Sequence, residues 1–259
     1  MWLQIAKAHW APKTGKESGR AISDLTFVDG TSLNTESAKS HAKNFYGKIN
    51  HPQIKELVQM ILRFYKEAKL KYPKVIWSDI RLWKMDLKGA YTLLSFRSEN
   101  VGLFGVEVTQ EYVFLQSCGI FGWMCMPATF QVVSRALVYE LNQLLISFVA
   151  IYVDDICGAC LAWDLHSDLS LSRKIVDDLL GSDSVADEKT EYGVRLDFIR
   201  YTVDIDNRTI SIASWSSYYS MICQVMRPFS SALHRMTSGR LHHLAAFIIP
   251  EDAKVSIRL

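Results

Sequence analysis

Two adjacent carboxylates, Asp154 and Asp155, stand between apolar stretches of this 259-residue chain. A largely apolar run over residues 144–153 precedes them and Ile156-Cys157 follows, a pattern that predicts a hairpin with the acids at its tip. Burying two neighbouring acids between hydrophobic strands is costly unless they are paired or bind a cation. The placement therefore favours a divalent metal pair. An ordinary polar turn is the alternative, since Asp is common in turns.

A third acid, Asp86, stands in a matching context upstream. It ends the strand-like stretch Trp83-Lys84-Met85-Asp86, and an aromatic residue, Tyr91, follows five positions later. Two strand ends that each carry acids indicate a shared site.

The composition limits the class of protein. About half of the residues (49%) are apolar, so the chain can bury a substantial core in one or two compact units. The formal charge of +2 gives no global sign of nucleic-acid binding and leaves a local basic groove open. Five cysteines, an odd number among apolar residues, argue against a disulfide framework and for a reducing compartment, the cytoplasm or the nucleus.

No membrane association or zinc site is expected. The longest apolar run stops at Asp154 after ten residues, too short to span a bilayer, and the first residues do not resemble a signal peptide. Cys157 and Cys160 have the spacing of zinc and redox sites, but no second pair accompanies them. Buried cysteines on the strand that leaves the acids are the preferred interpretation.

Hydrophobic periodicity predicts an α+β fold. Helices are expected over residues 52–70, from Pro127 to 144, and over 165–180 with Gly181 as the stop signal. Extended structure is expected at 75–77, at 82–87 and over 103–114, and two strands at 195–212 that turn near Asp206-Asn207. Residues 12–24 predict a basic hairpin around a Gly-containing turn, and residues 213–259 a partly apolar helical segment.

The ordered motifs resemble the reverse transcriptase domain of retrotransposons, most nearly the gypsy- and DIRS-type elements. The resemblance covers residues 12–212 and comprises the basic hairpin, the Asp86 motif, the Gly-Pro segment at 119–131, the Tyr152-Val153-Asp154-Asp155 motif and the hairpin after it. It implies a right-hand polymerase fold: fingers-like residues 1–80, a palm at 81–212 with a fingers contribution near 92–125, and a partial thumb at 213–259. The palm would be an antiparallel sheet with helices on one face.

The resemblance also implies a reaction, RNA-directed DNA synthesis. Nucleotidyl transfer onto a primer 3′-hydroxyl uses two metal ions about 4 Å apart that carboxylates bridge. Asp86 and Asp154 would bind two Mg²⁺ ions directly, with Mn²⁺ as a substitute, and Asp155 would be the third acid of the catalytic set. The implied partners are deoxynucleoside triphosphates and an RNA or DNA template with an annealed primer.

Further residues match the family's substrate contacts. Tyr91 would select against a 2′-hydroxyl, Gly122 would let backbone approach the substrate, and Phe121 occupies a position where many members carry Phe. The remaining nucleotide contacts would be Lys13, or Lys16 in its place, with Arg20 on the triphosphate, and Lys189 as proton donor to pyrophosphate. The primer and template contacts would be Tyr152, Pro127 and Arg200.

Two departures and two alternatives accompany the resemblance. Arg200 stands where the family usually has Gly, and the sequence begins almost inside the expected fingers and stops about where the thumb would be completed. Protease, RNase H and integrase signatures are absent, so any such activity is expected on another chain. A catalytically inactive, nucleic-acid-binding remnant is the first alternative. A metal-dependent hydrolase with paired acids is the second, and it leaves Tyr91 and the Gly-Pro segment unexplained.

Overall fold

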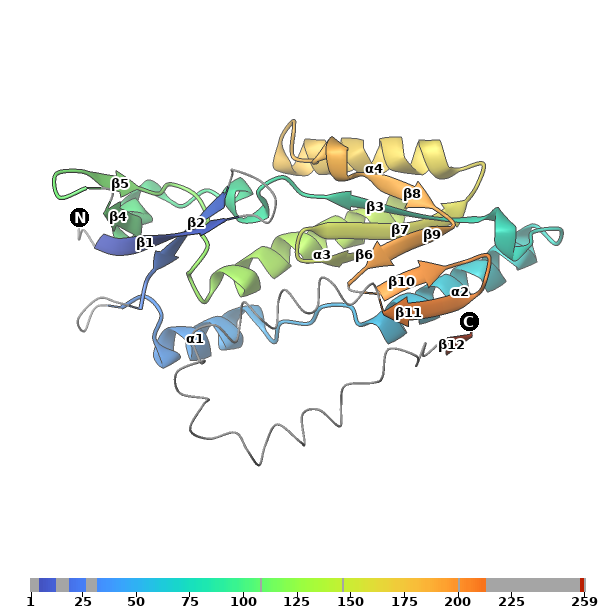
Figure 1. Cartoon of the computed structure of the whole chain (residues 1–259), viewed down its shortest axis with the longest axis horizontal. Helices are drawn as coiled ribbons and strands as arrows, with labels where there is room; N and C mark the ends of the chain where they lie inside the picture. Colours follow the sequence, from blue (N-terminus) through green and yellow to red (C-terminus); the bar gives the residue numbers. More distant parts are fainter. Residues whose placement is uncertain are drawn as a thin grey trace, which may run out of the picture.

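An antiparallel four-stranded sheet lies at the centre of the structure and carries the acids (Figure 1). The computed structural model describes residues 5–12, 19–26, 32–107, 109–145, 147–199, 201–212 and 257–258. The order of the central strands is β6 (Phe148–Tyr152), β7 (Asp155–Leu161), β3 (Ile80–Asp86) and β8 (Glu191–Gly193). The predicted α+β class is confirmed, because antiparallel sheets combine with helices throughout the described residues.

Both faces of the central sheet are covered. Helices α3 (Met126–Leu144) and α4 (Leu165–Leu180) pack on one face, and α2 (Ile54–Lys71) packs on the other with strands β9 to β11. The expectation of helices on one face only is therefore wrong. Apolar residues alternate on both sides of β3, with Leu82 on one and Trp83 on the other, so each side must be shielded from water.

The helices begin and end close to where periodicity predicts. α4 has the predicted ends, and Gly181 beyond it has a φ of 98°, which favours glycine. α3 carries Pro127 in its first turn, where a missing backbone donor costs nothing. Another helix, α1 (Glu36–Tyr46), was not predicted, and the Oγ1 of Thr35 caps it by accepting from the Ala38 amide at 3.0 Å.

A second sheet lies at one end of the molecule (Figure 1). Its strands, in spatial order, are β2 (Gly19–Asp24), β1 (Ile5–Pro12), β4 (Gly105–Glu107) and β5 (Val113–Leu115). The predicted basic hairpin is confirmed as the antiparallel pair of β1 and β2, with Pro12 opposite Gly19. The predicted extended stretch over 103–114 is instead the 3₁₀ helix η3 (Ser98–Phe104) followed by β4 and the start of β5.

The region 195–212 forms three strands rather than the two predicted. They are β9 (Arg195–Phe198), β10 (Tyr201–Asp204) and β11 (Thr209–Ile212), with β12 (Ile257–Arg258) beside β11. The predicted turn at Asp206-Asn207 is confirmed, and the missed reversal falls between Phe198 and Tyr201, which pair directly. Ile199 lies there at a φ of 48°, a conformation that a β-branched residue does not signal in sequence.

Two other stretches that were predicted to be extended are partly helical in the structure. The residues around 77 form the 3₁₀ turn η1 (Trp77–Asp79), because the Asp79 side chain accepts a hydrogen bond from the Ile76 amide at 2.9 Å. Leu144, the first residue of the apolar run 144–153, is the last residue of α3, and the strand within this run starts only at Phe148. The predicted helical segment in 213–259 lies outside the described residues, apart from β12.

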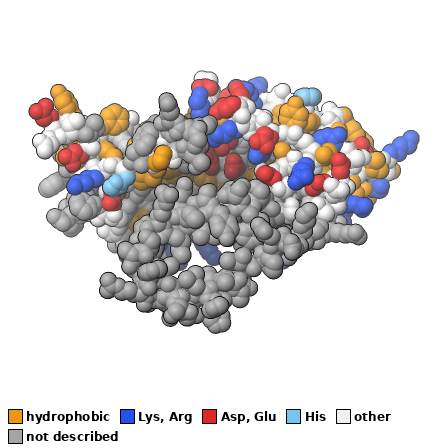
Figure 2. All heavy atoms as spheres, viewed as in Figure 1, with side chains coloured by type: hydrophobic (Ala, Val, Ile, Leu, Met, Phe, Trp, Pro, Cys, Tyr) orange, Lys and Arg blue, Asp and Glu red, His pale blue; other side chains and the backbone are white. Residues whose placement is uncertain are grey.

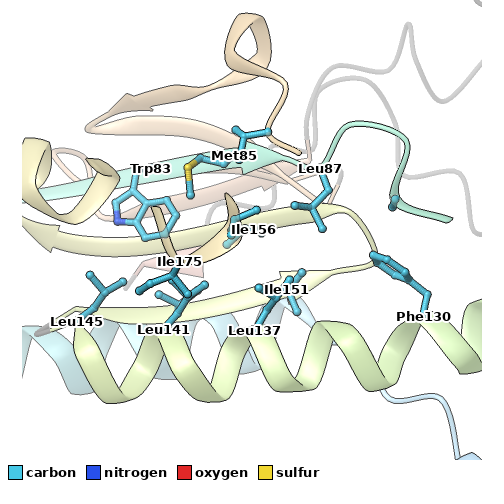
Figure 3. Close-up of a cluster of buried hydrophobic side chains, with 14 of the residues drawn as sticks. Trp83, Met85, Leu87, Phe130, Leu137, Leu141, Leu145, Ile151, Ile156 and Ile175 are labelled. Atoms are coloured by element: carbon cyan, nitrogen blue, oxygen red, sulfur yellow. The ribbon is translucent and has the colours of Figure 1, made fainter. Parts of the chain in front are cut away.

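The larger core cluster joins β3, β6 and β7 to α3 and α4 (Figure 3). Trp83 and Ile156 project from the strands toward Leu137 and Leu141 of α3, and each of these four side chains is at most 1% exposed. Outside the core, acidic and basic side chains are interspersed on the visible face of the molecule (Figure 2). None of the described helices combines the length and hydrophobicity that a membrane span requires.

Candidate active site

The hairpin tip predicted at the two acids is present. Tyr152 pairs with Asp155 across the β6–β7 ladder, so Val153 and Asp154 form a two-residue turn. Val153 has a φ of 58°, a conformation that costs a β-branched residue on the order of 1–3 kcal/mol. Two hydrogen bonds hold this turn, from the Ser134 hydroxyl to the Val153 carbonyl (3.3 Å) and from the Leu87 amide to the Asp154 carbonyl (2.9 Å). The tip is thereby fixed to α3 and to the end of β3.

Asp86 lies next to the hairpin tip. The ladder between β3 and β7 sets Asp86 directly opposite Asp155. Strand alternation places both carboxylates on the side of the sheet that Leu82 and Cys157 share, with their Cβ atoms about 5 Å apart. The structure thus brings together residues 69 positions apart in the sequence. Asp154, to which the resemblance gives a direct metal contact, lies in the turn beside this pair.

Negative charge accumulates at this point. Burial, together with the charges of Asp154 and Asp86, raises the pKa of Asp155 to about 6. The cations Lys84 and Lys189 oppose the shift only in part. Directly opposed like charges destabilise a strand pair, so the fold tolerates a strain here that a bound cation would relieve.

Two lysines accompany the acids. The Lys189 ammonium, from the 3₁₀ helix η4 (Asp187–Lys189), contacts Oδ1 of Asp86 at 2.5 Å, where the Asp86 side chain is only 15% exposed. Lys84 contacts Glu191 at 3.2 Å and donates to the backbone carbonyl of Asp197 at 3.3 Å. The sequence interpretation assigned no role to Lys84. Its place two residues before Asp86, on the same side of β3, was the signal that could have identified it.

The donor set at the hairpin tip consists of carboxylate oxygens. No group of three or more His, Cys, Asp or Glu side chains in the described ranges is gathered closely enough to hold a metal ion alone. Mg²⁺, however, commonly binds through one or two carboxylates, with substrate phosphates and water completing its shell. The opposed carboxylates of Asp86 and Asp155 match that pattern, and the ammonium on Asp86 stands where a cation would be drawn. The residues present therefore fit a magnesium ion that arrives with a phosphate ligand.

Tyr91 and Phe121, predicted to contact the nucleotide, lie side by side. Tyr91 belongs to the 3₁₀ helix η2 (Ala90–Leu93) just after Asp86, and its ring centroid is 4.9 Å from that of Phe121. The ring of Phe130 on α3 packs edge-on against Tyr91 at 5.7 Å. Tyr91 is half-buried, so its position is fixed by aromatic packing while part of the ring remains accessible.

Gly122 has a structural reason to be glycine. Its φ is 104°, and a Cβ there would lie 1.9 Å from the carbonyl oxygen of Ser23 on β2. The Ser23 amide donates to the Phe121 carbonyl at 3.0 Å, so this loop is attached to the basic hairpin. A close approach of Gly122 to a substrate stays a prediction.

The other residues predicted to contact the substrates lie on different sheets or outside the described residues. Tyr152 sits at the base of the hairpin tip, with its ring 4.9 Å from that of His51. The backbone of Arg20 lies on β2 opposite Ala11. Lys13, Lys16 and Arg200 lie outside the described residues.

The spacing of Cys157 and Cys160 does not produce a metal or redox site. The two residues lie on β7 three positions apart, so their side chains enter opposite cores. Burial raises the pKa of both thiols, which makes them weak ligands and weak nucleophiles. Their preferred interpretation as buried apolar residues is confirmed.

Comparison with known proteins identifies the fold. No protein-family model and no curated protein sequence matches the chain. Among solved structures, the foamy viral protease-reverse transcriptase in complex with double-stranded DNA is similar over 86% of this chain, with a TM-score of 0.56 and 13% identity. Telomerase from Candida albicans in complex with a fragment of telomeric RNA is similar over 83%, with a TM-score of 0.55 and 12% identity. Apo telomerase from Candida tropicalis is similar over 82%, with the same score and identity.

These similarities establish a reverse transcriptase-like fold. This chain spans 39%, 46% and 48% of the three solved chains, respectively. The fold is thus shared with polymerases, which agrees with the α+β architecture and with the position of the acids at strand ends.

Proposed function

We propose that this chain is the polymerase core of an RNA-directed DNA polymerase from a retroelement, of gypsy- or DIRS-like type. The observation that carries the proposal is the opposition of Asp86 and Asp155 at the fixed hairpin tip, beside Asp154. In a reverse transcriptase-like fold this is a set of oxygen donors with excess negative charge, which supports a cation-dependent reaction on phosphates.

The acids are proposed to hold Mg²⁺, or Mn²⁺ in its place. Two such ions would activate the primer 3′-hydroxyl and neutralise the triphosphate. Asp86 and Asp154 are assigned direct contacts and Asp155 the third position. In the reaction the 3′-oxygen forms a bond to the α-phosphorus, and the bond from that phosphorus to pyrophosphate breaks. The 3′-hydroxyl gives up its proton to solvent water, and Lys189 supplies one to the leaving pyrophosphate.

Substrate contacts follow from the residues around the acids. Tyr91, held by Phe121 and Phe130, is proposed to lie under the sugar and to favour deoxynucleotides. Gly122 and Phe121 would border the nucleotide, and the cationic Lys13 and Arg20 would bind its phosphates. The residues proposed to contact the primer and template are Tyr152, Pro127 and Arg200.

The proposed division of the chain places fingers at residues 1–80, the palm at 81–212 and part of a thumb at 213–259. RNase H and integrase activities would belong to other domains of a retroelement polyprotein. The working compartment would be the cytoplasm or the nucleus, in keeping with the unpaired cysteines of the described residues.

Primer extension tests the proposal. The purified protein should extend a DNA primer annealed to an RNA template when Mg²⁺ and deoxynucleotides are present. We expect Asp86→Asn, Asp154→Asn and Asp155→Asn each to lower the incorporation rate on the order of 10²–10³-fold, because each removes charge at the reacting phosphates. Asp178→Asn is the matched control, since Asp178 is an exposed acid on α4. Folded protein that shows no incorporation with either metal would contradict the proposal.

A non-catalytic nucleic-acid-binding remnant is the second candidate. It is favoured by the absence of a gathered three-ligand group in the described ranges and by the lysine that already pairs with Asp86. Such a protein would bind duplexes with an affinity that falls with salt concentration, and the acid-to-amide variants would bind more tightly, not less. Fluorescence anisotropy alongside primer extension separates the two candidates, because only the polymerase incorporates nucleotides.

A further inference from the structure

The two lysines at the acids are held in different ways. Lys84 contacts Glu191 and the Asp197 carbonyl, and its side chain is 21% exposed, so other groups fix its ammonium. Lys189 contacts Asp86 itself, and half of its side chain (50%) is exposed to solvent. Lys189 is therefore the cation that can leave a site carboxylate without breaking another contact that the structure records.

The backbone that carries Lys189 is firmly attached. The Ala186 amide donates to the Asp86 carbonyl at 2.9 Å, and the Lys189 amide donates to the Ala186 carbonyl at 2.9 Å. Asp187 forms a salt bridge with Arg173 of α4. η4 is thus bound to β3 on one side and to α4 on the other. A lysine that releases Asp86 would keep its anchor, and its long stem would hold the ammonium within reach of the same site.

A metal ion and this ammonium would compete for Asp86. Each is drawn by the same carboxylate, and two cations at contact with one oxygen repel each other. The carboxylate of Asp155 lies directly opposite Asp86, and any added positive charge stabilises its ionised form. A metal ion that binds Oδ1 of Asp86 must therefore displace the ammonium of Lys189 from that oxygen.

We propose that Lys189 is the counter-ion of Asp86 in the metal-free protein, that the metal displaces it, and that its ammonium then turns to the phosphates of the incoming nucleotide. This inference rests on the proposed function and adds an order of events to it. The free protein binds divalent metal weakly because Lys189 occupies Asp86. The metal and a triphosphate bind together strongly, because the phosphates supply ligands for the metal and a new partner for the ammonium.

Manganese binding to the free protein, without nucleic acid or nucleotide, tests this inference through the electron paramagnetic resonance signal of unbound Mn²⁺. Lys189→Met should bind Mn²⁺ roughly three- to tenfold more tightly than the parent, because the competing ion pair is gone. Lys189→Arg should stay within twofold of the parent, since its guanidinium keeps the pair.

The matched control is Lys88→Met. Lys88 forms a 2.7 Å salt bridge with Asp183, on the surface two residues beyond Asp86, and removing it deletes one positive charge near the acids without freeing Asp86. Its affinity for Mn²⁺ should change by less than twofold. Equal gains in Lys88→Met and Lys189→Met would overturn the inference, because general electrostatics would then explain both.

Two other outcomes separate this inference from the proposed function. If the parent binds Mn²⁺, if Asp86→Asn abolishes binding and if Lys189→Met binds no more tightly than the parent, the counter-ion role is overturned and the metal site stands. If folded parent and folded Lys189→Met both fail to bind Mn²⁺ up to millimolar concentrations, the metal site of the proposed function fails, and the inference fails with it.

Discussion

The two faces of strand β3 show how one strand serves both stability and chemistry. Trp83 and Met85 face the core formed with α3 and α4 and are 0% and 2% exposed. Lys84 and Asp86 alternate with them and point to the opposite side, where charged groups meet. A slip of one residue would exchange the two sets, so the buried residues fix the register on which the acid pair depends.

The faces also differ in how their polar atoms are satisfied. On the charged side, Lys84 pairs with Glu191 and Lys189 with Asp86. On the packed side, which here means the side that faces α3 and α4, Nε1 of Trp83, Oδ2 of Asp168 and Oγ of Ser172 are buried with no hydrogen-bond partner among the described residues. Unpaired polar atoms cost most where water is excluded, so mutations on the packed side should have the larger effects on stability.

The largest effect is expected at Trp83. Its ring fills the space above Gly158, where a Cβ would come within 2.4 Å of Trp83 Cζ2. Trp83→Ala should lower the free energy of unfolding by about 3–5 kcal/mol, because it leaves a cavity in a fully buried cluster. Lys84→Ala, one residue away, should lower it by less than about 1 kcal/mol. Urea denaturation of both variants measures the contrast, and equal losses would refute the division of β3 into two faces.

Asn142 tests the outer edge of the sheet, where a side chain pairs with the backbone of the edge strand β6. The side-chain amide of Asn142 accepts from the Val149 amide at 2.9 Å and donates to the Val149 carbonyl at 3.1 Å. It thus completes the outer edge of β6 at a residue that is 0% exposed. Asn142→Leu should lower the free energy of unfolding by roughly 2 kcal/mol, since both backbone groups lose their partner.

Asn142→Asp separates the two hydrogen bonds. At pH 7 its ionised carboxylate keeps the acceptor for the Val149 amide and has no donor for the Val149 carbonyl, so a loss smaller than that of Asn142→Leu is expected there. Thermal unfolding of the two variants side by side measures this. A neutral Asn142→Leu would show that water, not Asn142, satisfies the edge of β6.

Local pattern was sufficient to predict the elements that carry the site. The helical period and the stop signal at Gly181 gave both ends of α4, and the acids between apolar runs gave the β6–β7 hairpin. Tyr91 and Phe121, each expected at the nucleotide, lie in contact although 30 positions separate them. These features depend on short-range spacing or on a family resemblance, both of which a single sequence contains.

Long-range pairing was not predictable from the same patterns. The opposition of Asp86 and Asp155 depends on the register of β3 against β7, which core packing decides. The contact of Lys189 with Asp86 joins residues 103 positions apart. The chain reversal at Ile199 was missed because isoleucine does not signal a turn. The covering of the second face of the sheet was missed because the alternation of apolar residues does not tell which elements pack on them.

The smallest expected change in the free energy of unfolding concerns Asp168. It is an increase, whereas the substitutions at Trp83 and Asn142 should lower this free energy. Asp168, a residue of α4, is 6% exposed, and burial raises the pKa of its carboxyl above the ordinary value; the Ser147 side chain opposes this shift and the charge of Asp164 adds to it. The folded state therefore prefers the neutral acid. As the pH rises above the unfolded pKa of about 3.9, ionisation favours the unfolded chain, and the parent loses stability until the pH has passed the raised folded pKa.

Asp168→Asn removes that loss, since an amide has about the same shape and stays neutral. The variant should match the parent near pH 3.5 and exceed it by about 1 kcal/mol at pH 7, measured by urea denaturation at both values. Asp178→Asn, on the exposed side of the same helix, should show no such dependence on pH. A parent whose advantage over Asp168→Asn grows with pH would mean that the ionised carboxylate has a partner on the packed side. The contrast between the two faces of the sheet would then rest on apolar packing alone.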